Sequence, residues 1–169
     1  MKKLPLLCIY GFIFFCPSAQ KTITTQPQLT KQLLELLDHS KDGFNAIKGE
    51  ANAALNEKNK YSGAKYFKTS VTLKDAVENY IEEKYSKITF RADFGEKLTE
   101  AGGKELFKKL SKAINEGSWD GFEVKEYSGY IYGDFVQIRR NNDHKHSILL
   151  TIDDGEYHET APKVYITVE

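Results

Sequence analysis

The stretch from Gly103 to Val124 constrains the fold most, because it joins an amphipathic helix to the first of several strands. Its apolar residues recur at helical spacing and its lysines fall on the other face, which predicts a helix over 101–116. Gly117 ends that pattern, Trp119 and Gly121 lie in a turn, and a strand follows. Everything after this point reads as strand, so the helical half of the sequence meets its sheet half here.

The second half shows alternating apolar and polar residues between turn residues, which predicts an antiparallel meander. The expected strands span 122–127, 130–140, 146–152 and 163–168, with a turn at Ser128-Gly129 and a bulge at Gly133. The alternation also predicts that one face of the sheet is buried and the other is open to solvent.

The first half mixes two periods. Leucines at helical spacing predict a helix over 29–47, interrupted at Asp42-Gly43, and alanines favour a short helix within 48–65. Period two predicts strands over 67–73 and 88–94, and helical spacing predicts a helix over 74–85 between them. Such a unit is compatible with a parallel crossover or with an antiparallel pair. The sequence shows no internal repeat.

These elements together predict an α+β fold, a mostly antiparallel sheet of about five to six strands with about three helices packed on one face. Residues 29–169 are expected to form a single domain behind a flexible lead over 21–28. A domain of this length can bury a core without metal or disulfide support.

The first twenty residues have the order of a secretory signal, a basic start at Lys2-Lys3, an apolar run over 4–15 and small residues before Lys21. The apolar run is too short to span a membrane, so cleavage after residue 18, 19 or 20 is expected to leave no membrane span. The predicted location is the periplasm or the outside of the cell. Phe14 and Phe15 before Cys16 disfavour a lipoprotein.

Cys8 and Cys16 both lie in the signal, so the mature chain is expected to have no disulfide, no catalytic thiol and no cysteine metal site. Removal of two lysines leaves 22 basic against 24 acidic residues, a net charge of −2. That balance gives no electrostatic footprint for nucleic acid. Gly102-Gly103 lacks the spacing of a phosphate loop, and no cofactor is predicted.

Three histidines suggest the leading enzymatic alternative, a hydrolase or metal-dependent enzyme. His144 and His146 are two residues apart and would share a strand face, and His158 follows in the next loop. Imidazoles placed in this way could hold one metal ion. The competing interpretation, which we favour, is that residues 141–146 form a solvated hairpin turn.

Tyrosines concentrate in the second half and suggest a binding surface. Tyr130 and Tyr132 should share a strand face, Arg139 lies further along the same strand, and Tyr165 is placed on an outward face. Aromatic side chains with a polar tip suit protein surfaces and sugar stacking, although they also serve cross-strand packing. The sequence therefore favours a small exported, non-catalytic binding protein whose partner is a protein rather than a glycan.

Overall fold

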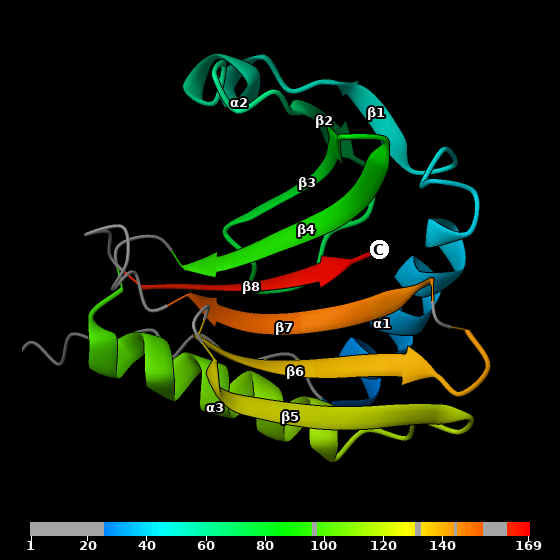
Figure 1. Ribbon diagram of the computed structural model, residues 1–169, viewed down its shortest axis with the longest axis vertical. Coiled ribbons are helices and arrows are strands. Elements are labelled where there is room, and N and C mark those ends of the chain that lie inside the picture. The colour runs from blue at the N-terminus through cyan, green and yellow to red at the C-terminus, as the bar shows by residue number, and fades with distance from the viewer. Residues whose placement is uncertain (1–25, 96–97, 131–132, 144, 154–161) are drawn as a thin grey trace, which may run out of the picture.

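The computed structural model describes residues 26–95, 98–130, 133–143, 145–153 and 162–169. These residues form one antiparallel sheet of eight strands and three helices (Figure 1). The elements are α1 (Gln26–Ser40), β1 (Lys48–Ala51), α2 (Ala53–Lys58), β2 (Lys65–Thr69), β3 (Glu78–Lys84), β4 (Lys87–Gly95), α3 (Glu100–Asn115), β5 (Phe122–Tyr130), β6 (Gly133–Arg140), β7 (Ser147–Asp153) and β8 (Lys163–Val168). The predicted α+β class with an antiparallel sheet is confirmed.

The strand order is β1-β2-β3-β4-β8-β7-β6-β5, which places β8 near the middle of the sheet, between β4 and β7 (Figure 1). The two halves of the chain repeat one arrangement, a helix followed by four antiparallel strands, with α2 inserted in the first half. The repeat escapes the sequence because different apolar side chains can fill equivalent core positions.

The main core lies between one face of the sheet and the pair α1 and α3. Leu33 and Leu36 of α1 and Leu110 and Ile114 of α3 are buried in one apolar cluster with Phe90 of β4. The strands contribute alternate residues to the same cluster, including Ile138, Ile148, Leu150, Val164, Ile166 and Val168. Period-two burial of this kind defines a covered face and an opposite face of the sheet.

The prediction that about three helices pack on one face is wrong, because α2 lies on the opposite face. Its Leu55 packs with Tyr66 and Tyr80 in a separate small cluster. Phe67 and Ile81, the next residues along β2 and β3, belong to or pack against the main cluster instead. Adjacent strand residues point to opposite faces, so α2 covers a corner of the face that α1 and α3 leave uncovered.

The predicted number of strands is also wrong, and the difference arises in the first half. Strand β3 lies within the predicted helix 74–85, and β1 lies within a stretch where only a short helix was expected. Strands β3 and β4 pair antiparallel, with Ile81 opposite Phe90, which excludes the parallel alternative. Helix α3 and strands β4 and β8 lie where the sequence predicted them.

The hairpin of β5 and β6 turns later than predicted. Strand β5 continues through Ser128 to Tyr130, which pairs with Gly133, and the register shifts between Tyr127 and Tyr130. The irregularity expected at Gly133 therefore falls on the partner strand. Within the described ranges, no helix combines the length and the apolar character that a membrane crossing requires.

Candidate binding face

The face opposite α1 and α3, over strands β4, β8, β7, β6 and β5, is called the open face. One row of Cα partners crosses it from Asp93 through Tyr165, Thr151 and Phe135 to Tyr127. Each of these residues is half-buried, and their neighbours along the strands belong to the covered face. Among the described residues, α2 is the one helix that packs on this side, at the β2–β3 corner.

Three aromatic side chains of this row, Tyr127, Phe135 and Tyr165, form what we call the aromatic row. The rings of Tyr127 and Phe135 stack with centroids 4.5 Å apart and an interplanar angle of 18°. Stacked rings of neighbouring strands stabilise a sheet and at the same time present a flat apolar surface. The alternation of the sequence predicted an outward position for Tyr165, where the structure places it.

Arg91 lies over the aromatic row at Tyr165. Its guanidinium carbon is 3.8 Å from the centroid of the Tyr165 ring, and its Nε donates a 2.9 Å hydrogen bond to Oδ1 of Asp93. Burial opposes the charged form of Arg91, but the carboxylate of Asp93 outweighs it and raises the pKa of Arg91 above its ordinary value. Burial also raises the pKa of the Tyr165 hydroxyl. The cation is thereby fixed in one orientation and remains charged.

Charges on the open face occur mostly as compensated pairs. Glu123 accepts an ion pair from Lys125 at 2.9 Å and lies 3.6 Å from Arg139. Lys87 pairs with the carboxylate of Glu169, and Arg91 pairs with Asp93. A face with paired charges and half-buried rings resembles a protein contact surface more than a site for a highly charged ligand.

Of the three residues predicted to bind a partner, the structure describes the side chain of Arg139 alone. Arg139 lies on the open face of β6, opposite Glu123 and Ser147. The backbone of Tyr130 ends β5, but its side chain lies outside the described residues, as does Tyr132. Sequence reasoning missed Arg91 and Phe135, because their proximity to Tyr165 depends on the order and register of strands far apart in the chain.

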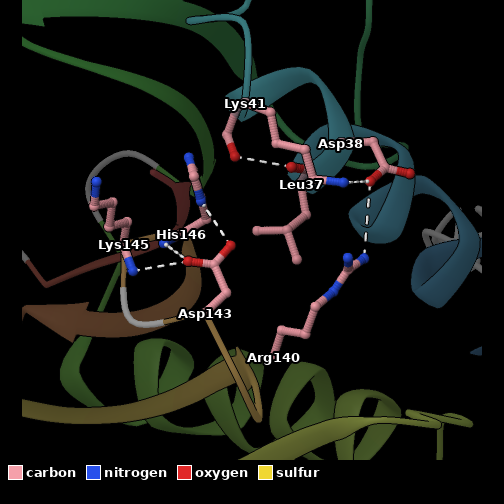
Figure 2. A network of polar contacts seen from close by, with 8 residues as sticks. Leu37, Asp38, Lys41, Arg140, Asp143, Lys145 and His146 are labelled. Carbon is pink, nitrogen blue, oxygen red and sulfur yellow. Dashed lines mark hydrogen bonds and ion pairs between the residues drawn. The ribbon is translucent and has the colours of Figure 1, made fainter.

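The structure places one of the three histidines proposed as metal ligands. Nδ1 of His146 lies 2.7 Å from Oδ2 of Asp143, while His144 and His158 fall outside the described residues (Figure 2). Within the part of the chain that the structure describes, no three His, Asp or Glu side chains gather closely enough to hold a metal ion. The metal-dependent alternative stays a prediction, which a calorimetric zinc titration can test.

Asp143 makes several hydrogen bonds with the residues just before β7. Its Oδ1 accepts hydrogen bonds from the backbone N–H groups of Lys145 at 2.9 Å and His146 at 3.3 Å (Figure 2). These backbone bonds and the His146 ring lower the pKa of Asp143 to about 2. Arg140, at the end of β6, lies 3.8 Å from Asp38 of α1. The ion pair of Arg140 with Asp38 therefore connects the end of β6 to α1.

Comparison with known proteins gives no match to a family model, to a curated protein or to a solved structure.

Proposed function

We propose that the chain is a small exported, non-catalytic binding protein that recognises another protein through the open face. The observation that carries the proposal is the aromatic row, half-buried rings on a face that α1 and α3 leave uncovered. Protein interfaces are enriched in tyrosine, phenylalanine and arginine and depleted in unpaired charge at their centre. The order of residues in the first twenty positions supports export.

Arg91 and Arg139 are the polar anchors of the proposed interface. Arg91 is held by Tyr165 and Asp93, so it loses little conformational entropy when a partner docks. Arg139 lies at the margin of the open face, with its charge balanced by Glu123. Tyr130 and Tyr132 remain proposed contacts at the end of the same hairpin.

The test compares two triple variants of the full chain. The open-face variant combines Phe135→Ser, Tyr165→Ser and Arg139→Ala, and the control variant replaces Lys104, Lys108 and Lys112 of α3 with alanine. Partners are captured with the tagged wild-type chain from envelope and medium of its own cells, and each purified partner is then titrated by calorimetry. Loss of interface hot spots typically costs about 2 kcal/mol or more, so we expect the dissociation constant to rise by a factor of about 30.

Circular dichroism establishes that both variants are folded before binding is compared. Unchanged affinity of every captured partner for the folded open-face variant would refute the proposed surface. Equal weakening by the α3 variant would show that binding depends on general charge and not on this face.

A further inference from the structure

We propose that the β3–β4 hairpin end, a surface separate from the aromatic row, is a docking point for an acidic segment of a partner protein. The hairpin tip consists of Lys84, Tyr85, Ser86 and Lys87, and the loop after α2 lies beside it. Tyr85 is 86% exposed and Tyr61 of that loop is 93% exposed. Both rings are therefore open to solvent and accessible to a partner.

The tip holds Tyr85 outward in an unfavourable backbone conformation. Tyr85 and Ser86 have φ values of 50° and 66°, which are the central residues of a two-residue hairpin loop. Such loops favour Asn-Gly, because a Cβ is disfavoured at positive φ, glycine has none, and asparagine tolerates this region better than most residues. Lys84 and Lys87 are also direct Cα partners across the hairpin, where like charges repel. Unfavourable backbone conformations and unfavourable residue pairs of this kind occur often at functional sites.

Two open hollows at the tip share Lys84, Tyr85 and Lys87 as lining residues. One, of about 350 Å³, also contains Gly63 and Lys65, so it lies between the tip and the loop after α2. The other, of about 310 Å³, opens beside Glu82 and Thr89. Both are large enough for a side chain of a partner and are bordered by an exposed aromatic ring.

The charge of these hollows favours an anionic occupant. Lys65 and Lys84 have no carboxylate within ion-pair distance among the residues that the structure describes. The Lys84 ammonium lies 5.2 Å from the centroid of the Tyr85 ring, and Glu83 is neutralised by Lys48 at 2.6 Å. Interspersed acids such as Glu82 would repel a uniformly anionic membrane or nucleic acid. A protein segment with separate carboxylates, by contrast, can place them beside the lysines.

The first experiment replaces Tyr85-Ser86 with Asn-Gly in the full chain. Because asparagine tolerates positive φ and glycine has no Cβ, the replacement is expected to raise the midpoint of thermal unfolding by about 3–8 °C. Gly63→Ala, which adds a side chain at positive φ, serves as the opposite control. An unchanged or lower midpoint for the Asn-Gly variant would overturn the claim that the tip is held at a cost.

The second experiment titrates the isotopically labelled chain with hexaglutamate and follows backbone amide signals by NMR. We expect saturable shifts confined to residues 61–65 and 83–87, weakened at least tenfold in Lys65→Ser/Lys84→Ser and in the Asn-Gly variant. The lysines of α3 provide an internal control within the same sample. Larger shifts over 104–112, or binding to phosphatidylglycerol vesicles without binding to the peptide, would overturn the proposal.

Discussion

At the scale of single residues, two glycines with positive φ differ in the space available for a side chain. Gly133 has a φ of +90°, and a Cβ added there would lie 2.0 Å from the carbonyl oxygen of Ile152. Gly63 has a φ of +70°, but nothing lies within 4 Å of its hypothetical Cβ. Both positions disfavour alanine for the same backbone reason, and only Gly133 has no room for it.

We therefore expect Gly133→Ala to lower the free energy of unfolding by more than about 3 kcal/mol and Gly63→Ala by about 1 kcal/mol. Urea denaturation of the two variants measures the difference directly. Similar costs at the two positions would mean that β6 can move away from β7 at this point, contrary to the close backbone approach in the structure.

In the candidate site, the outward position of Tyr165 was predictable from the sequence, but its contact with Arg91 was not. Tyr165 stood out because Val164 and Ile166 flank it on a strand, and its outward position follows from period two alone. Arg91 did not stand out, because nothing near it in the chain indicates an aromatic neighbour. Its place over Tyr165 depends on the pairing of β4 with β8, a contact between residues 74 positions apart.

At the scale of elements, Asn56 of α2 adds hydrogen bonds to the packing of Leu55 against the sheet. The Asn56 side chain donates from Nδ2 to the carbonyl oxygen of Tyr66 at 2.8 Å and accepts from the Tyr66 N–H at 3.0 Å. β1 ends at Ala51, opposite Phe67, so on this side of β2 the Asn52 N–H donates to the Tyr66 carbonyl oxygen at 2.8 Å and Asn56 supplies the acceptor for the Tyr66 N–H.

Asn56→Ala should speed hydrogen exchange at the Tyr66 amide at least tenfold and lower stability by about 1–2 kcal/mol. Asn59→Ala is the matched control, since the Asn59 side chain donates to Leu55 within the same helix. Amide exchange measured by NMR compares the two variants. Continued protection of the Tyr66 amide in Asn56→Ala would show that the bond to Asn56 is not what shields this amide from exchange.

The failed prediction of a helix over 74–85 has a physical cause at this scale. Ile81 is buried within the main cluster on one face of β3, whereas Tyr80 is buried on the other face with Leu55 and Tyr66. A strand covered on both faces loses the period-two signal, and adjacent apolar residues then imitate helical spacing. Strand β1 was missed for the opposite reason, because most of its residues are exposed and none is apolar enough to mark a buried face. Helix α3 and strands β4 and β8 each have one buried face, and their patterns were therefore readable.

At the scale of the whole molecule, the pairing of β4 with β8 joins the two halves of the sheet through a common core. Phe90 of β4 is fully buried and pairs with Val168, whereas Trp119 belongs to the second half, where its Nε1 donates to the carbonyl oxygen of Ile114. Unfolding of one half should therefore expose the core of the other.

Phe90→Ala is expected to destabilise the chain by about 3–5 kcal/mol. Trp119 fluorescence and far-ultraviolet circular dichroism should report the same lowered midpoint in urea, although Phe90 and Trp119 lie in different halves. Tyr61→Ala, at a fully solvated ring, should leave both midpoints unchanged. A fluorescence midpoint that resists Phe90→Ala would show that the halves unfold independently.

The central position of β8 determines when the sheet can be completed during synthesis. The ribosome makes β8 after all seven of its companions, and until then β4 and β7 each have an edge of unpaired backbone N–H and C=O groups. The nascent polypeptide therefore contains two partial sheets that cannot yet join. The complete sheet is therefore expected to form only after the last strand has been synthesised.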